Sequence, residues 1–346
     1  MVKVAINGFG RIGRVTLRAI LTKYLDKVKI VAVNTSGSMD VNGWAHLFEY
    51  DSVYGKFKGK IEIKKSLPAG RQGETDEIGV LIINQQKIPF LAQREPAKIP
   101  WKKYGVDVVI ESTGVFRNRK EAAAHLEAGA RKVIISAPTD DVDTYVIGVN
   151  EKKYRKQLVI DNASCTTNCI APVVKIMMEN FGIQKALLST IHAYTSDQEL
   201  VDGSHSDLRR ARAAAFNIIP TSTGADEATV EVIPEMTGLF NGLAYRVPVI
   251  CGSIADLSLV TTKRTTVKEV NQVFIKAAAE KYRGIVEASS EPLVSSDIIG
   301  NSASAIIDLS LTQVVDGDLV KVVAWYDNEW GYSCRLIEEA IWINEH

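Results

Sequence analysis

The amino-acid sequence predicts an α/β fold divided into two domains, and three observations support this prediction. The chain has 346 residues, which is more than a single hydrophobic core usually serves. Its first half alternates strand and helix patterns and begins with a glycine-rich turn between a strand and a helix. In its second half, long strand patterns follow one another without a helix between each pair.

The first half begins with the βαβ pattern of a parallel sheet. Residues 2–6 have the pattern of a buried strand, apolar side chains then follow at helical spacing up to Leu21, and residues 27–34 form a second strand pattern. This order indicates parallel strands joined by a crossover helix. Further strands are expected at residues 106–112, 132–136 and 158–162, with a helix at residues 119–129.

Residues 64–79 interrupt this alternation with a polar, turn-rich segment between two short apolar runs. Its glycines, proline and charges indicate an exposed connection without a catalytic role.

The second half opens with a helix pattern after Asn168 and continues with long strands. These features predict an antiparallel or mixed sheet with helices on one face. The expected strands are residues 185–194, 255–262 and 319–327, and the expected helices are residues 266–282 and 329–344.

Composition and charge exclude several classes of partner. Lysine plus arginine and aspartate plus glutamate both number 41, so no net charge favours nucleic acid or an anionic membrane. The first residues enter a strand pattern without a secretory leader, and no apolar run is as long as a membrane span. Four cysteines do not form a disulfide framework or paired metal ligands. We therefore expect a cytoplasmic protein without a resident metal.

Gly8, Gly10 and Gly13 form the pattern G-x-G-x-x-G directly after the first strand. The first glycine permits the tight turn, the second lets the backbone approach a pyrophosphate, and the third lets the helix pack on the strand. The amides of Arg11 and Ile12 would then face the phosphates at the positive end of the helix. The turn therefore predicts dinucleotide binding.

The end of the second strand indicates which dinucleotide is used. An acidic residue there would bind the ribose hydroxyls of NAD and repel the additional phosphate of NADP. This chain has Asn34, Thr35 and Ser36 instead. Because hydroxyls can donate to a 2′-phosphate, the sequence favours NADP, and a neutral site that still accepts NAD remains the alternative.

Two cysteines, Cys165 and Cys169, lie four residues apart at the start of a helix pattern. Asp161, Asn162 and Ser164 before it are typical capping residues. Cys165 would therefore stand at the helix N-terminus, where the dipole and free amides favour a thiolate, whereas Cys169 lies one turn deeper. The pattern favours one reactive thiol over a redox pair or a metal site.

A thiolate nucleophile needs a base, and the chain has five histidines. His192 lies where an apolar strand gives way to a polar loop, which is a common place for a site residue. His46 and His125 lie in helix patterns, and His346 is terminal. His192 is the favoured partner and His205 is the alternative.

Six segments together resemble the phosphorylating glyceraldehyde-3-phosphate dehydrogenases, in the order of that family. The segments are INGFGRIGR, ASCTTNCIAPV, TIHAYTSDQ, DLRRARAAAFNIIPTSTGA, YRVPV and WYDNEWGYS. The resemblance implies a Rossmann-type domain formed by residues 1–164 with 329–346. It also implies a catalytic domain with a mixed sheet at residues 165–328, a C-terminal helix that returns to the first domain, and a homotetramer.

Carried over residue by residue, the resemblance makes Cys165 the nucleophile and His192 the base. The expected cofactor-binding residues are Gly8, Gly10, Arg11, Ile12, Gly13, Asn34, Thr35, Ser36, Arg94, Thr113, Gly114, Ser204, Asn328 and Tyr332. Asn328 would hold the nicotinamide amide, with Tyr332 packed beside it. Thr195 and Arg246 match one anion site, and the other is matched by Ser164, Thr166, Thr223 and Gly224, with Arg210 close by.

Two departures from the family pattern bear on these expectations. NAD-specific members usually have aspartate in place of Thr35 and Leu-Pro in place of Gly203 and Ser204, so this chain resembles the NADP-using branch. After Gly224 the family commonly has small residues and a lysine, but this chain has Asp226 and Glu227. Carboxylates that pointed into an anion site would weaken it, so we expect them to face a surface or an interface.

The resemblance leads to a mechanistic hypothesis. Cys165 attacks the aldehyde carbon of glyceraldehyde 3-phosphate, His192 takes the hydroxyl proton as hydride leaves for the nicotinamide, and inorganic phosphate releases the resulting thioester as 1,3-bisphosphoglycerate. The metabolic direction, glycolytic, gluconeogenic or carbon-fixing, stays open.

Three other readings remain at this stage. Erythrose-4-phosphate dehydrogenase shares the thiol, the histidine and much of the pocket. Aspartate-semialdehyde dehydrogenase pairs cysteine with histidine but lacks the matched hydroxyl sets. A dinucleotide- or RNA-binding protein without turnover is disfavoured by the intact Cys165 and His192 and by the neutral charge.

Overall fold

The computed structural model describes residues 1–65 and 77–346, so most of the predicted connection at residues 64–79 lies outside the described residues. The chain divides into two compact units. The first unit consists of Met1–Thr144, Tyr154–Asn162 and Leu336–His346, and the second of Tyr145–Lys153 and Ala163–Arg335.

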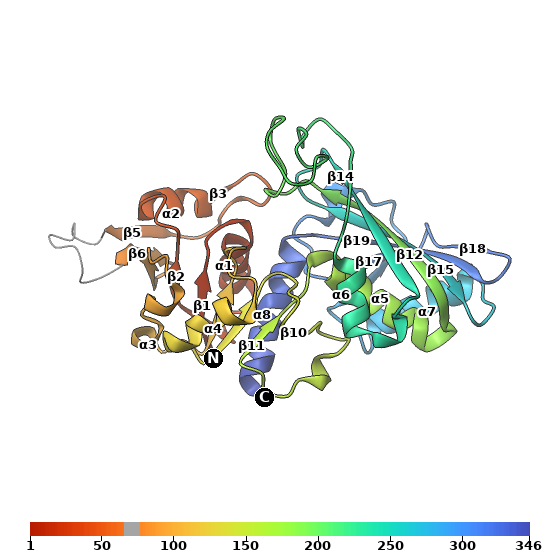
Figure 1. Cartoon of the computed structure of the whole chain (residues 1–346), viewed down its shortest axis with the longest axis horizontal. Coiled ribbons are helices and arrows are strands. Elements are labelled where there is room, and N and C mark those ends of the chain that lie inside the picture. The colour runs from red at the N-terminus through yellow and green to blue at the C-terminus, as the bar shows by residue number, and fades with distance from the viewer. Residues whose placement is uncertain (66–76) are drawn as a thin grey trace. The chain divides into compact units, whose positions relative to one another are not determined.

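The first unit is built on a sheet of nine strands, seen at the red-to-yellow end of the chain in Figure 1. The strand order is β10-β11-β9-β8-β1-β2-β7-β6-β5 within the described residues. The sheet strands are β1 (Val2–Asn7), β2 (Val28–Asn34), β5 (Ile61–Lys65), β6 (Glu77–Ile83), β7 (Gln86–Leu91), β8 (Val108–Glu111), β9 (Lys132–Ile135), β10 (Asp143–Thr144) and β11 (Val159–Asp161). A separate hairpin pairs β3 (Tyr50–Asp51) with β4 (Gly55–Lys56).

The helices of this unit follow the predicted alternation. They are α1 (Arg11–Lys23), α2 (Val41–Glu49), η1 (Pro96–Lys98), α3 (Trp101–Tyr104), α4 (Arg119–Glu127) and the C-terminal part of α8 (Trp330–Glu345). The predicted return of the C-terminal helix to the first domain is confirmed, because Leu336–His346 belongs to this unit and Glu338 accepts a hydrogen bond at 2.6 Å from Tyr24, the residue that follows α1.

The strand order of the first sheet changes direction at β1. This strand pairs in parallel with β2 on one side and with β8 on the other, and the βα connections run outward from it in both directions. Ligands of open parallel sheets bind beyond the carboxyl ends of the strands at such a switch point. Asn7 and Glu111 are opposite each other at these ends, so the predicted glycine turn lies at the switch point.

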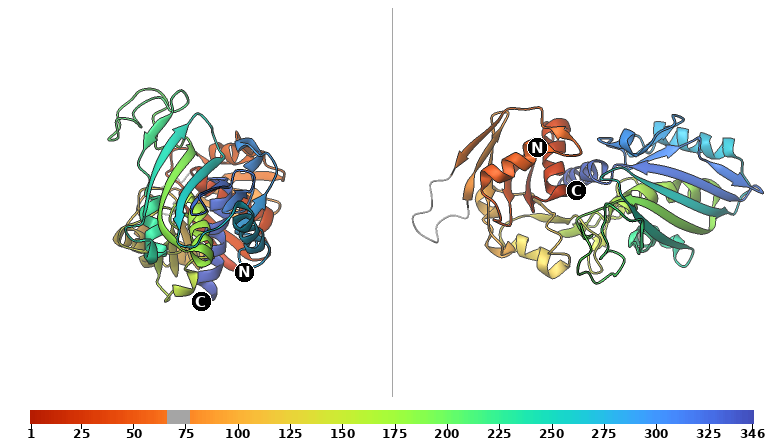
Figure 2. Two further views of the ribbon diagram at one scale, coloured as in Figure 1. Left: turned by 90° about the vertical axis from the view of Figure 1, so that its right-hand side faces the viewer. Right: turned by 90° about the horizontal axis from the view of Figure 1, so that it is seen from above.

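The second unit contains a mixed sheet, seen in green and blue in Figure 2. Its order is β13-β14-β12-β15-β19-β17-β16, and β18 pairs with β19 at one end. The strands are β12 (Ile183–Ala193), β13 (Ile219–Thr221), β14 (Phe240–Val247), β15 (Ser253–Thr261), β16 (Val286–Ser289), β17 (Ala305–Asp308), β18 (Gln313–Val315) and β19 (Leu319–Tyr326). The helices are η2 (Glu151–Lys153), α5 (Cys165–Phe181), α6 (Ala225–Val232), η3 (Pro234–Met236), α7 (Val267–Ala279), η4 (Ser295–Ile298) and the first turns of α8.

Strand alternation places one face of this sheet against the helices, as predicted. Successive side chains of a strand point to opposite faces, and the inward set of β12 begins with Ala186 and Leu188. These two residues share a core with Ile170 of α5, Ala228 of α6 and Phe274 of α7. The same alternation brings Thr190 and His192 to the helix-covered face at the end of the strand.

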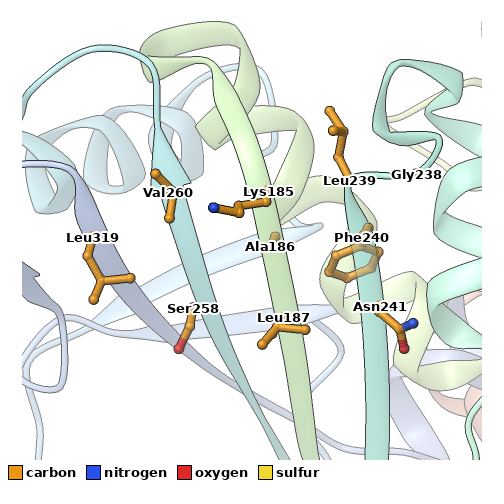
Figure 3. Close-up of a pocket in the computed structure, with 10 residues that line it drawn as sticks. All are labelled: Lys185, Ala186, Leu187, Gly238, Leu239, Phe240, Asn241, Ser258, Val260 and Leu319. Carbon is orange, nitrogen blue, oxygen red and sulfur yellow. The ribbon is translucent and has the colours of Figure 1, made fainter.

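The opposite face of the sheet has no helix over it among the described residues, and large apolar side chains remain exposed there. Leu187 is 64% exposed and Leu243 is 50% exposed. Figure 3 shows a hollow on this face, where side chains of neighbouring strands stand apart. It is lined by Lys185, Ala186, Leu187, Gly238, Leu239, Phe240, Asn241, Ser258, Val260 and Leu319.

Within the described parts of the chain, none of the helices has the length and apolar composition needed to cross a membrane.

Candidate active site

The glycine turn is fixed by close backbone contacts at the switch point of the first unit. Gly8 has φ +96°, and a Cβ there would lie 2.6 Å from the Thr113 nitrogen. A Cβ at Gly13 would lie 2.0 Å from the Gly8 carbonyl oxygen, whereas a Cβ at Gly10 would have no atom within 4 Å. Gly8 and Gly13 therefore set the backbone, and Gly10 leaves open space in front of the helix.

The N-terminus of α1 is suited to an anion. Gly10 caps the helix without a side-chain hydrogen bond, and the first turn has no acidic residue. The Arg11 guanidinium instead pairs with Asp51 at 2.6 Å. Burial acts to raise the pKa of Asp51, but the hydrogen bond and charge of Arg11, together with hydrogen bonds from the Val53 and Tyr54 amides, outweigh it and the pKa is lowered. The backbone amides of this turn, rather than the Arg11 side chain, are thus available to phosphates.

The loop after β8 is held by a buried carboxylate that the sequence analysis did not select. Glu111 accepts hydrogen bonds from the backbone nitrogen of Thr113 at 2.8 Å and from Asn7 at 2.5 Å, and its carboxylate lies 3.0 Å from His125 Nε2. The Thr113 hydroxyl also donates to it. Glu111 is therefore the structural partner of His125. It also holds the start of the loop that contains Thr113 and the exposed Gly114.

At the end of β2, only one of the three predicted polar side chains is exposed. Asn34 donates to Asn7 at 2.7 Å, and the Thr35 hydroxyl donates to the Leu91 carbonyl at 3.0 Å, so both side chains serve the fold. Ser36 is exposed. Arg94 is exposed as well, and it follows Gln93, whose backbone is hydrogen-bonded to the Asn34 side chain.

In the second unit, the turn before α5 presents Cys165 at the first helical position. Ala163 adopts φ +50°, which is unusual for a residue with a Cβ, and its carbonyl accepts a hydrogen bond from Tyr332 at 2.9 Å. Ser164 caps the helix by accepting from the Thr167 amide at 3.0 Å. This confirms the predicted start of the helix and the capping role of Ser164.

His192 is the histidine that meets the thiol. Its Nε2 lies 3.4 Å from Cys165 Sγ. The alternative, His205, accepts a hydrogen bond from the Asp207 amide at 2.9 Å and lies 3.9 Å from Asp197. The geometry therefore brings Cys165 and His192 together as predicted.

The other ring nitrogen of His192 faces polar groups that fix its orientation. Nδ1 lies 2.7 Å from the Ala193 carbonyl oxygen, which can only accept, and it also contacts an N–H group of Arg246, which can only donate; a proton on Nδ1 satisfies the carbonyl. Nε2 is then free to accept the proton of the thiol. Arg246 also contacts Nδ1 and donates to the Ala193 carbonyl at 3.2 Å, because His192 and Arg246 are direct partners in the parallel pairing of β12 with β14.

The pKa of Cys165 differs from the sequence-based expectation. Burial raises the pKa of this thiol, and this effect outweighs Arg246 and the hydrogen bonds around the sulfur, which lower it. The expected thiolate of the free protein is thus wrong in direction, because desolvation exceeds the contribution of the helix N-terminus. Burial, followed by the charge of Arg246, lowers the pKa of His192 to about 3, so the ring is neutral at physiological pH.

A tyrosine behind the thiol was not selected from the sequence. The Tyr326 hydroxyl lies 2.9 Å from the hydroxyls of both Thr166 and Thr190. Burial raises the pKa of Tyr326, so it stays neutral. The Thr166 hydroxyl is therefore engaged inside the protein. Tyr326 lies in the WYDNEWGYS segment, two residues before Asn328, and that position was the available signal.

The predicted anion-binding residues lie around the strands next to β12. Arg210 donates to Thr221 at 2.8 Å and pairs with Asp197 at 2.6 Å, two residues after the partly exposed Thr195. Thr223 is partly exposed, and Gly224 is the N-cap residue directly before α6. Asp226 accepts from the Gly242 amide of β14 at 3.0 Å, and Glu227 is exposed. The Asp226 carboxylate is thus engaged by the sheet backbone.

Two further cofactor candidates lie in this unit. Asn328 is buried, and its Oδ1 accepts from the Gly252 amide at 3.1 Å and from the Ser253 hydroxyl at 2.9 Å. Ser204 is exposed. Among the described residues, no group of three or more His, Cys, Asp or Glu side chains is arranged to hold a metal ion.

The glycine turn provides a paired test. Gly13→Ala should lower the free energy of unfolding by about 1–3 kcal/mol, because its Cβ overlaps the Gly8 carbonyl. Gly10→Ala should leave stability unchanged but weaken dinucleotide binding, because its Cβ enters the open space before α1. Thermal unfolding and titration with the dinucleotide measure the two effects. Equal stability losses in both variants would contradict this assignment.

Arg246 provides a test of the electrostatics. Its positive charge lowers the pKa of Cys165, so Arg246→Leu should move the pH dependence of alkylation by iodoacetamide to higher pH. The control is Arg264→Leu, which removes an exposed arginine paired with Asp316. If the pH midpoint of alkylation in Arg246→Leu is unchanged or lower, Arg246 does not lower the pKa of the thiol.

Comparisons with known proteins agree with this site. Residues 2–119 match the family described as "Glyceraldehyde 3-phosphate dehydrogenase, NAD binding domain", and residues 164–328 match its C-terminal domain. The chain is 47% identical to glyceraldehyde-3-phosphate dehydrogenase 2 of Streptomyces avermitilis, and the matched region covers 99% of this chain and 98% of that protein. It is 48% identical to the Priestia megaterium glyceraldehyde-3-phosphate dehydrogenase and to glyceraldehyde-3-phosphate dehydrogenase 1 of Bacillus subtilis, over the same shares. The chain therefore belongs to the glyceraldehyde-3-phosphate dehydrogenase family.

Proposed function

We propose that this protein converts glyceraldehyde 3-phosphate, inorganic phosphate and NAD(P)+ to 1,3-bisphosphoglycerate and NAD(P)H. The observation that carries the proposal is the contact of 3.4 Å between Cys165 Sγ and His192 Nε2 at the start of α5. Family membership supports it, because relatives with this name are matched over nearly the whole chain.

Cys165 acts as the nucleophile. Because burial raises its pKa and His192 is neutral, the thiol transfers its proton to His192 as the sulfur attacks the aldehyde carbon. His192 returns this proton to the former aldehyde oxygen, which the amides of the first turn of α5 stabilise by hydrogen bonds as its charge develops, and the product is a neutral thiohemiacetal.

His192 then serves as the base for oxidation. Its Nε2, which has returned the thiol proton, accepts the hydroxyl proton of the thiohemiacetal, while the proton on Nδ1 stays hydrogen-bonded to the Ala193 carbonyl. The bound dinucleotide supplies the acceptor for the hydride. Loss of proton and hydride leaves a thioester on Cys165, which inorganic phosphate cleaves.

The two phosphate groups of this reaction need separate sites of hydroxyls, amides and arginine. We assign Thr195 and Arg246 to one site. Ser164, Thr166, Thr223, Gly224 and the nearby Arg210 form the other. The Thr166 hydroxyl is held by Tyr326, so its backbone amide is the group left for an anion.

The dinucleotide fits the residues of the first unit. The uncapped amides at the start of α1 and the open space before Gly10 suit a pyrophosphate. We propose that NADP is preferred and NAD is accepted. No carboxylate stands among the three residues that end β2, whereas the exposed Ser36 and Arg94 can contact a 2′-phosphate.

We further propose that the active form is a cytoplasmic homotetramer. Leu187 and Leu243 are exposed on the open face of the second sheet, and Leu208 and Phe216 are 81% and 86% exposed on the long connection after β12. Apolar patches of this kind mark association surfaces. The domain limits proposed above, residues 1–164 with 329–346 and residues 165–328, are kept as part of this proposal.

The nucleophile is tested by a matched pair of variants. Cys165→Ser should reduce phosphate-dependent cofactor reduction at least about 10³-fold, because a serine hydroxyl is a poorer nucleophile. Cys169→Ala should retain activity, because that thiol is fully buried one turn deeper. The measurement is the spectrophotometric rate of cofactor reduction with glyceraldehyde 3-phosphate, with and without inorganic phosphate, for both variants. Near-normal turnover of the serine variant would disprove the mechanism.

The cofactor preference is tested by rates with NAD and NADP side by side. We expect a higher kcat/KM with NADP, and Arg94→Ala should lower it about 10- to 100-fold for NADP while changing the NAD value little, because one charge-assisted contact is lost. Lys98→Ala, which removes a nearby exposed cation paired with Glu95, is the control. A strong preference for NAD would refute the NADP assignment.

A further inference from the structure

Ser253 connects two parts of the catalytic unit that the proposed reaction uses. It is the first residue of β15, which lies between β12 and β19 in the sheet. β12 ends at His192 and Ala193, and β19 is followed directly by Asp327 and Asn328. Ser253 is 1% exposed, so its hydroxyl has no access to solvent and must find its partners inside the protein.

The hydrogen bonds of Ser253 have only one consistent direction. The backbone nitrogen of Ala193 lies 3.1 Å from Ser253 Oγ, and because an amide can only donate, the hydroxyl accepts this bond. Its own proton is then directed to Asn328 at 2.9 Å. The atom of Asn328 that receives this proton has to be an acceptor, which identifies it as the amide oxygen Oδ1.

A second amide fixes the same atom. The nitrogen of Gly252 donates to Asn328 Oδ1 at 3.1 Å. Gly252 has φ +89°, and a Cβ there would lie 2.2 Å from the Ser295 carbonyl oxygen. The backbone at this point therefore tolerates only glycine, and the direction of its N–H group is set by packing.

Two donors thus hold one end of the Asn328 side chain, and the other end remains free. Nδ2 of Asn328 has no hydrogen-bond partner among the residues that the structure describes, although the residue is only 6% exposed. A rotated amide would place Nδ2 against two other donors. The network therefore commits Asn328 to present an N–H donor, which suits a carbonyl oxygen such as that of a carboxamide.

We propose that Ser253 is a positioning residue for the cofactor: it fixes the Asn328 amide so that Nδ2 donates to the carboxamide oxygen of the nicotinamide. This inference rests on the proposed function. Ser253 acts at the same time on the base, because Ala193, whose nitrogen it holds, provides the carbonyl that accepts from His192 Nδ1 at 2.7 Å. One hydroxyl therefore helps to fix the positions of both the Asn328 amide and the His192 ring.

Ser253→Ala tests the proposal. Without the hydroxyl, Asn328 keeps one of its two restraints, so the KM for NADP and NAD should rise about tenfold, the equivalent of one hydrogen bond. The KM for glyceraldehyde 3-phosphate should change less than twofold. Ser253→Thr, which retains a hydroxyl, should restore most of the cofactor KM. Ser304→Ala is the matched control, because Ser304 is a buried serine of the same unit whose hydroxyl has no partner among the described residues.

A double-mutant cycle shows whether Ser253 acts through Asn328. In an Asn328→Ala background, Ser253→Ala should cause no further rise in cofactor KM, because the group that it positions is gone. Additive effects would overturn the proposal. If Ser253→Ala does not fold, Ser253→Cys, which has nearly the same volume and a weaker donor, should give a smaller rise in the same direction.

The remaining outcomes separate this inference from the proposed function. If the unmodified protein reduces the cofactor and Ser253→Ala retains its cofactor KM, the positioning role is wrong and the proposed function stands. If the unmodified protein shows no phosphate-dependent reduction with glyceraldehyde 3-phosphate, the proposed function is wrong and this inference falls with it.

Discussion

The chemistry of the second unit depends on how the carboxyl end of β12 is held. This strand runs parallel to β14 and antiparallel to β15, so its last residues are fixed from both sides. The parallel register sets Arg246 against His192, and the antiparallel neighbour brings the Ser253 hydroxyl to the Ala193 amide. The histidine can therefore meet a thiol on α5 in one orientation, and no carboxylate in the described part of the chain is bonded to its ring.

The electrostatic environment of the thiol follows from the same arrangement. Burial makes the charged forms of both Cys165 and His192 costly, and the nearby Arg246 favours a thiolate while disfavouring an imidazolium. A neutral pair that exchanges its proton during attack is the arrangement consistent with these effects. The first unit contributes in a different way, because the groups proposed to bind phosphate there are backbone amides whose positions are fixed by close backbone contacts at Gly8 and Gly13.

Much of this organisation could be predicted from the sequence, because periodic patterns and capping residues are local signals. The βαβ unit at residues 2–34, the cap at Ser164 and the choice of His192 are of this kind. The short patterns of β7 and α6 did not predict these two elements. Glu111, Ser253 and Tyr326 could not be selected either, because their importance comes from partners far along the chain, such as Asn7, Asn328 and Thr166. The pKa of Cys165 depends on how deeply the thiol is buried. Its place at the start of a helix does not reveal this burial.

The alternation of β12 has a consequence for how assembly and turnover are related. Leu187 and His192 stand on opposite faces of a single strand, one toward the open side of the sheet and the other toward α5. A molecule bound over Leu187 touches the reverse of the segment that carries the proton acceptor. If the proposed homotetramer places a neighbouring copy there, dilution into single chains would remove the support behind His192, five residues further on, and the specific activity would decrease as the protein concentration is lowered.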